Sequence, residues 1–142
     1  MSGDSERAKE LLGSGAYTCV LCRGEETVVC TERGVKPLLD LLDGGSDLKG
    51  FSAADKVVGK AAAFLYVLLG VTDVYSPVMS EAAARVLREN GIEPRCDTLT
   101  EKIVNRAGTG ICPMEAAVAE LSDPSEALWA IRKRLSELRS AV

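Results

Sequence analysis

The chain has 142 residues, of which 46% are hydrophobic and 27% are charged, and it carries a formal net charge of −4 with no histidine. These values predict one globular domain spanning residues 1–142 and exclude a disordered chain. The acidic charge argues against nucleic acid as a partner, because affinity for a phosphate backbone rests on clustered lysine and arginine.

Four elements are predicted in the first part of the chain. Glycine and proline set their limits, because these residues favour turns, helix starts and helix ends. The predicted elements are a helix over residues 5–12, a β-hairpin of residues 17–23 and 27–31 around the turn Gly24-Glu25-Glu26, and a short helix that Pro37 opens and Gly44 ends.

The strongest helix signal begins at Ser52. Ser52 and Asp55 have the spacing of a capping box, and Gly70 ends the segment. Residues 61–69 are apolar on nearly every side, which is typical of a helix buried against a sheet. The sequence therefore predicts a central helix between Ser52 and Gly70.

Strands and helices alternate in the remainder of the chain. The predicted elements are a strand at 71–75, a helix at 80–89 capped by Ser80, a strand at 92–96, a helix at 100–105, a short helix opened by Pro113, and a C-terminal helix at about 124–139. This order predicts an α/β fold in which helices cover both faces of a mixed sheet. The apolar side of the last helix is interpreted as a packing face within the domain, with a homodimer contact as the alternative.

The sequence carries no signal for a membrane or for export. The longest apolar stretch, residues 61–69, is far shorter than the ~20 residues that span a bilayer. Residues 1–7 are polar and lack the apolar core of a signal peptide. We therefore expect a cytoplasmic protein without a membrane partner.

Five cysteines are present, and an odd number in a cytoplasmic protein predicts free thiols. Cys19 and Cys22 form a CxxC, but they lie in an apolar run with the character of a strand, where residues three apart point to opposite faces. A structural zinc site needs ligands that converge. We therefore expect ordinary strand thiols, no metal and no cofactor, with a zinc or redox role for this pair as the alternative.

Two stretches carry a family resemblance: DKVVGKAAA at residues 55–63 and NRAGTGICPME at residues 105–115. With the order of the elements, they resemble a family of uncharacterised prokaryotic proteins that is assigned to the cytidine deaminase-like fold. The resemblance covers about residues 5–120. It implies a three-layer α/β/α sandwich whose site lies where the central helix and the following helix begin.

The sequence departs from the zinc deaminases at every metal ligand. Active enzymes of that class hold zinc with H-x-E and P-C-x-x-C motifs, each at the start of a helix. Ala53-Ala54-Asp55 stands in the approximate place of the first motif, and Pro77-Val78-Met79-Ser80-Glu81 stands in the place of the second. The resemblance therefore implies a deaminase-like fold without catalytic zinc.

The glycine-rich loop before Pro113 is the main candidate for binding a ligand. Pro113 suits the first position of a helix and Cys112 its cap, so free backbone N–H groups and the helix dipole would favour an anion there. Arg106 could add a bidentate contact to phosphate or carboxylate. The alternative is that the glycines only form a turn. The predicted ligand contacts are Lys60, Arg106, Gly108, Thr109, Gly110 and Cys112.

Cys112 is also a candidate nucleophile. A helix start raises the thiolate fraction of a cysteine, and Glu115 or Asp55 would act as the base. The alternative is that Cys112 is an inert cap. Because the chain has no histidine, the usual activator of a thiol is missing.

Lys60 is unusual because it lies in a helix that is expected to be buried. A buried lysine is costly unless it is paired, and its partner would be Asp55 or a bound anion. The alternative is that its stem carries the charge to the surface.

Three functions remain open from the sequence. The leading hypothesis is a zinc-less deaminase-fold protein that binds a nucleotide or another phosphorylated small molecule at the loop 106–115 and at the start of the central helix. The second is an enzyme with Cys112 as nucleophile. The third is a non-catalytic, homo-oligomeric interaction module.

Overall fold

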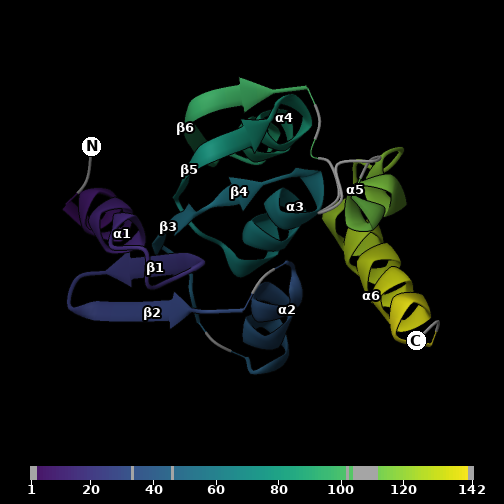
Figure 1. Ribbon diagram of the computed structural model, residues 1–142, viewed down its shortest axis with the longest axis horizontal. Coiled ribbons are helices and arrows are strands. Elements are labelled where there is room, and N and C mark those ends of the chain that lie inside the picture. The colour runs from purple at the N-terminus through teal and green to yellow at the C-terminus, as the bar shows by residue number, and fades with distance from the viewer. Residues whose placement is uncertain (1–2, 33, 46, 102, 104–111, 141–142) are drawn as a thin grey trace.

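A single mixed sheet forms the centre of the molecule in the computed structural model, which describes residues 3–32, 34–45, 47–101, 103 and 112–140 (Figure 1). Its strands are β1 (Cys19–Arg23), β2 (Glu26–Cys30), β3 (Ser52–Asp55), β4 (Val57–Val58), β5 (Asp73–Ser80) and β6 (Glu93–Thr100). β1 runs antiparallel to β2 and β3, whereas β3, β4 and β6 run parallel to β5. Because β3 and β4 pair with β5 in one register, they are two parts of the same strand line.

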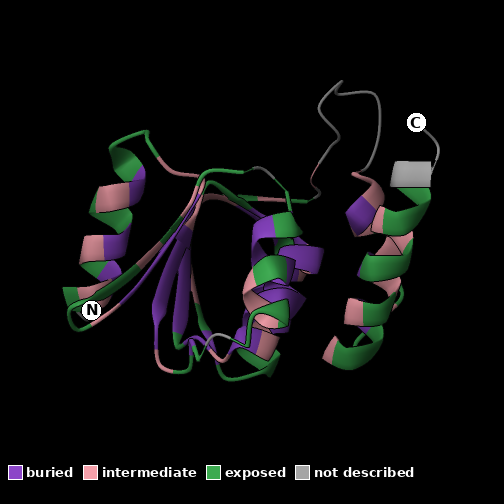
Figure 2. Ribbon diagram, turned by 90° about the horizontal axis from the view of Figure 1, so that it is seen from below, coloured by how far each residue is buried: buried purple, intermediate pink, exposed green. Residues whose placement is uncertain are grey.

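Helices cover both faces of this sheet (Figure 2). They are α1 (Gly3–Gly13), α2 (Lys36–Asp43), α3 (Lys60–Leu69), α4 (Glu81–Glu89), α5 (Pro113–Val118) and α6 (Pro124–Ser140). α1 packs alone on one face, where it closes a small core with β1, β3 and β5. α2, α3 and α4 pack on the other face, over the larger core, and α5 and α6 lie on the outer side of α3. The α/β fold with a mixed sheet and helices on both faces is confirmed. Within the described ranges, no helix combines the length and the apolarity that crossing a bilayer requires.

α3 is buried on nearly all sides, as predicted. It lies between the sheet and the outer pair α5 and α6, so the apolar side chains on opposite sides of the helix both find partners. Phe64, Leu65 and Tyr66 are each 0% exposed. Gly70 ends the helix with a φ of +81°, a left-handed conformation that glycine adopts without strain.

The predicted start of this helix at Ser52 is wrong. Residues 52–58 form β3 and β4, and the helix begins only at Lys60. The Ser52 hydroxyl donates to Asp73 (2.6 Å) rather than capping a helix. Ala53 and Ala54 favour a helix locally, but they are buried between β1 and β5, and strand pairing there overrides propensity. The comparison of Ala53-Ala54-Asp55 with a motif at a helix start therefore fails.

The following elements need smaller corrections. β5 extends through Pro77 to Ser80, so the predicted strand at 71–75 was too short. Ser80 does cap α4 as predicted, because its hydroxyl accepts from the Ala83 amide (3.0 Å). The predicted helix at 100–105 is wrong where it can be checked: Thr100 ends β6, and Glu101 is not helical.

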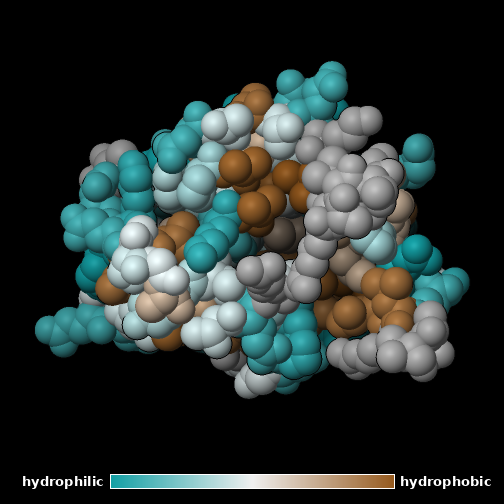
Figure 3. Space-filling model, in the orientation of Figure 1, coloured by the Kyte–Doolittle hydropathy of each residue, from teal (hydrophilic) through white to brown (hydrophobic). Residues whose placement is uncertain are grey.

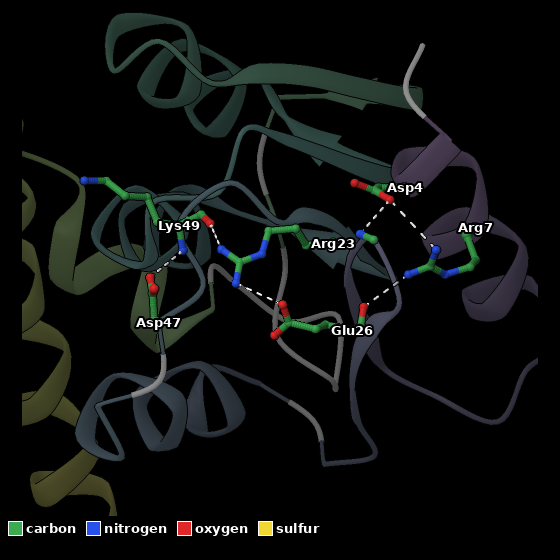
Figure 4. Close-up of polar contacts among 7 residues, drawn as sticks. Asp4, Arg7, Arg23, Glu26, Asp47 and Lys49 are labelled. Atoms are coloured by element: carbon green, nitrogen blue, oxygen red, sulfur yellow. Dashed lines mark hydrogen bonds and ion pairs between the residues drawn. The ribbon is translucent and has the colours of Figure 1, made fainter.

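The hairpin and its neighbours are held by polar contacts around Arg23 (Figure 4). Its guanidinium donates to the Lys49 carbonyl (2.6 Å) and to Glu26 (3.0 Å). Asp4 of α1 accepts from the Gly24 amide (3.1 Å), and Arg7 donates to the Glu26 carbonyl (3.1 Å). The turn is thereby tied to α1 and to the segment before β3, which fixes the register of β1 against β2.

Candidate functional site

A cavity of about 390 Å³ opens where the β3–β4 line ends and α3 begins. The carboxyl ends of parallel strands in α/β sheets are a common place for ligands, because the strand–helix loops leave a crevice there. Figure 3 shows apolar side chains around a hollow in the region of β4 and α3. The described lining residues are Thr18, Gly34, Val35, Asp55, Lys56, Val57, Gly59, Ala61, Ala62, Ile103, Cys112, Met114 and Glu115.

The strands are interrupted at the level of this cavity. The register of the β3–β4 line with β5 passes from Ala54↔Tyr75 to Val57↔Val78 and leaves residues 55–56 unpaired with β5, although Asp55 still pairs with Cys19 of β1. β5 and β6 break at the same level, since no pair joins Pro77 to Asp97. Proline has no N–H to donate to a sheet ladder. The interruption frees Asp55 to turn toward α3 and the cavity.

Asp55 is a half-buried carboxyl group that is bonded to α3. Its Oδ2 accepts a hydrogen bond from the Tyr66 hydroxyl of α3 (2.7 Å). Burial raises the pKa of Asp55 to about 6, against the opposing effect of hydrogen bonds from Tyr66 and from the backbone of Val57 and Lys56. Asp55 is therefore ionised at neutral pH and takes up a proton in weak acid.

Glu115 closes the start of α3. Its two carboxylate oxygens accept from the backbone N–H groups of Lys60 (2.7 Å) and Ala61 (2.8 Å). The contact is so close that a Cβ on Gly59 would come within 2.5 Å of the carboxyl group. A negative charge at a helix start is favourable, so the Glu115 carboxylate stabilises the N-terminus of α3 in the way that a bound anion would. Glu115 is the third residue of α5, which begins at Pro113 as predicted.

Lys60 of α3 provides a second link between α3 and α5. Its ammonium group donates to the Ala119 carbonyl just after α5 (3.0 Å) and lies 5.7 Å from the centre of the Phe64 ring. This carbonyl, and not Asp55, is the described hydrogen-bond partner of the side chain. Contact of Lys60 with a ligand stays a prediction.

Cys112 borders the cavity and is half-buried. It lies at the N-cap position of α5, as predicted, but its side chain makes no capping hydrogen bond. The structure therefore brings together the three predicted catalytic residues, Asp55, Cys112 and Glu115, from β3 and from the start of α5. Four predicted ligand contacts, Arg106, Gly108, Thr109 and Gly110, lie outside the described residues.

The sequence analysis missed two contributors to the site. Tyr66 was interpreted only as part of the apolar helix, although its hydroxyl is the partner of Asp55. A buried tyrosine needs a partner for its hydroxyl, so this residue was the available signal. Thr18 was interpreted only as part of the predicted strand 17–23; its hydroxyl donates to the carbonyls of Cys30 (3.0 Å) and Glu32 (2.7 Å).

Comparison with known proteins agrees with this architecture. A family described as "Domain of unknown function (DUF1893)" matches residues 7–135. The chain belongs to the DUF1893 family. A crystal structure of a DUF1893 family protein, TM1506 from Thermotoga maritima at 2.70 Å resolution, is 25% identical in sequence and covers 96% of this chain and 92% of its own, with a TM-score of 0.82. No curated protein matches the chain. The part of the chain that matches the family therefore includes the helices on both faces of the sheet and most of α6.

Proposed function

We propose that this DUF1893 protein binds a small molecule in the cavity at the end of the β3–β4 line, and that the ligand is a nucleotide or another phosphorylated metabolite. The observation that carries the proposal is that Asp55, Cys112 and Glu115 border one cavity of about 390 Å³. Ligand pockets typically have volumes of ~300–1,000 Å³ and are largely apolar with a few polar groups. The site meets both criteria.

The walls favour a flat, uncharged group at the inner end. Val35, Val57, Ile103 and Met114 supply apolar surface. Asp55 offers a carboxylate that can accept a hydrogen bond from a ring amine. A nucleobase has both properties, since it is flat and its edges carry N–H donors.

The phosphate end of the ligand needs a different position. Glu115 already takes the N–H groups of Lys60 and Ala61, so a phosphate at the start of α3 would meet a carboxylate. Lys56 on the cavity wall is a suitable cation. Arg106 and the loop 108–110 remain the proposed phosphate contacts on chemical grounds, because arginine binds phosphate in bidentate fashion. The cytidine deaminase-like assignment of the fold is retained as part of this proposal.

A second candidate function is an enzyme in which Cys112 is the nucleophile. It is favoured by the shared cavity, which Cys112 borders together with two carboxyl groups. Asp55 is the better base, because both oxygens of Glu115 already hold backbone amides. Alkylation of Cys112 at pH 7 no faster than a free thiol would contradict this candidate.

The test is calorimetric titration of the protein with nucleobases, nucleosides, nucleotides and sugar phosphates. We expect a nucleotide to bind, and Asp55→Asn to weaken its binding about tenfold or more, because a hydrogen bond to a charged group contributes ~1.5–3 kcal/mol. Asp97→Asn is the matched control, since Asp97 also accepts from a tyrosine hydroxyl (Tyr75, 2.6 Å) but does not line this cavity. Equal affinity of wild type and Asp55→Asn, or no binding across the panel, would overturn the proposal.

A further inference from the structure

Cys19 and Cys30 face each other across the β1–β2 hairpin. They are direct partners in the antiparallel register, in the row Cys19↔Cys30. Directly opposed residues of an antiparallel pair have Cα atoms ~4.5–5.5 Å apart, within the ~4.4–6.8 Å that a disulfide spans. Because the two residues are directly opposed, their side chains lie on the same face of the hairpin. The register therefore gives the two cysteines a backbone spacing that a disulfide can bridge.

The two thiols differ in access and in acidity. Cys19 is 3% exposed, whereas Cys30 is half-buried and borders a surface groove between β2 and α2. The hydrogen bond that Cys19 donates lowers the pKa of Cys30, and the effect exceeds that of burial and of nearby carboxylates. The same hydrogen bond and burial raise the pKa of Cys19. Cys30 is thus the more accessible and the more acidic of the two thiols, and Cys19 is the buried thiol behind it.

We propose that Cys19 and Cys30 form an oxidation site, in which hydrogen peroxide converts the two thiols to a reversible disulfide across the hairpin. The Cys30 thiolate attacks one peroxide oxygen, so that an S–O bond forms, the O–O bond breaks and the departing hydroxide is protonated to water. The Cys19 sulfur then attacks the Cys30 sulfenic acid, so that the S–S bond forms, the S–O bond breaks and a second water leaves. Two thiols and one peroxide yield one disulfide and two waters.

The oxidation site is connected to the ligand cavity. Tyr66, whose hydroxyl donates to Asp55 on the cavity wall, also acts on the Cys19 thiol, where it lowers the pKa against the larger, raising effects of Cys30 and burial. A continuous chain of polar groups thus runs from the groove at Cys30 to the cavity. Disulfide formation removes the Cys19 proton from this chain, so oxidation is expected to change ligand affinity; this consequence rests on the proposed function.

The test is peptide mapping of the full chain after treatment with hydrogen peroxide. Trypsin cuts after Arg23, between the two cysteines, so the disulfide joins the peptide of residues 10–23 to that of residues 24–33. We expect this cross-linked pair in most chains, with the loss of two hydrogen atoms in the intact mass and reversal by a thiol reductant. Because residues 10–23 also contain Cys22, fragmentation must assign the bond to Cys19.

Cysteine variants show whether the cross-link is specific to Cys19 and Cys30 or arises from general oxidation of the cysteines. Cys112→Ser and Cys96→Ser, which change half-buried cysteines outside the hairpin pair, should leave the cross-link unchanged. Cys30→Ser should abolish it, and circular dichroism checks that the variant is folded. A cross-link through Cys22, or conversion of Cys30 to sulfinic acid without a cross-link in the wild type, would overturn the proposal. The readout is independent of any ligand, so failure of the proposed function leaves the oxidation site to be judged separately.

Discussion

Two tyrosine–aspartate pairs lie on opposite faces of the same sheet and behave differently. On the face covered by α3, Tyr66 donates to Asp55 (2.7 Å); on the face covered by α1, Tyr75 donates to Asp97 (2.6 Å). Asp55 is half-buried among β1, α3 and the cavity wall, whereas Asp97 is exposed. The hydrogen bond is the same in both pairs, and the access of water to the carboxylate differs.

The difference in burial affects the pKa values of the groups in each pair. Burial raises the pKa of Asp55 to about 6, so the enclosed pair can titrate in weak acid. The tyrosine of each pair also has a raised pKa: burial, followed by the hydrogen bond to Asp97, raises the pKa of Tyr75 to about 12, and burial raises the pKa of Tyr66 well above its ordinary value. The exposed carboxylate of Asp97 joins β5 to β6 through Tyr75, whereas Asp55, whose pKa is raised by burial, is a candidate for binding and proton transfer.

The largest expected effect comes from removing the hydroxyl of each tyrosine. Tyr66→Phe leaves Asp55 without its side-chain donor in a place that water reaches poorly, so we expect a loss of about 2 kcal/mol in the free energy of unfolding. Tyr75→Phe should cost less than about 1 kcal/mol, because water can replace the lost donor at Asp97. Urea denaturation at pH 7 measures both values. Equal losses would contradict the claim that enclosure separates the two pairs.

A somewhat smaller effect is expected in the pH dependence of stability. The folded pKa of Asp55, about 6, is higher than its ordinary value of 3.8, so the folded state binds this proton more tightly than the unfolded state does. The contribution of Asp55 is therefore fully present below about pH 3.8 and is lost as pH rises through 6, by an amount on the order of 2 kcal/mol.

Asp55→Asn removes this contribution while keeping an oxygen that can accept from Tyr66. The difference in free energy of unfolding between wild type and variant should therefore fall between about pH 4 and pH 6 and stay constant at higher pH. Urea denaturation across this range measures it, and a carbon NMR titration of the Asp55 carboxyl gives the pKa directly. Parallel stability curves for the two proteins would mean that Asp55 is well hydrated.

The sequence predicted the layers of the fold better than it predicted this site. The apolar run at 61–69 depends on local periodicity and was predicted correctly, and so was the order strand, helix, strand after Gly70. Ser52 and Asp55 were assigned to a helix cap because their spacing fits one, whereas their partners, Asp73 and Tyr66, are set by the tertiary fold. Local spacing carries no information about such partners.

The cysteine pair was missed for a related reason. A three-residue turn at Gly24-Glu25-Glu26 would not align Cys19 with Cys30, whereas the observed pairing of Arg23 with Glu26 leaves a two-residue turn and does align them. A difference of one residue in the turn thus shifts every partner along the hairpin. The prediction that Cys19 and Cys22 point to opposite faces is confirmed, since they belong to different cores.

The smallest expected effect concerns the surroundings of Tyr75. The Lys9 ammonium group lies 4.8 Å from the centre of the Tyr75 ring, in a cation–π contact at the surface. Such contacts contribute ~0.5–1 kcal/mol at exposed sites, so Lys9→Gln should lower the free energy of unfolding by about 0.5 kcal/mol. In Tyr75→Leu, which lacks the ring, the same lysine change should have no effect, and a double-mutant cycle in urea measures the coupling. A coupling near zero would indicate that Asp97 and the packing of α1 hold Tyr75 without the lysine. A coupling of the expected size would mean that the exposed pair, unlike the enclosed one, is stabilised by a charge on the far side of its ring.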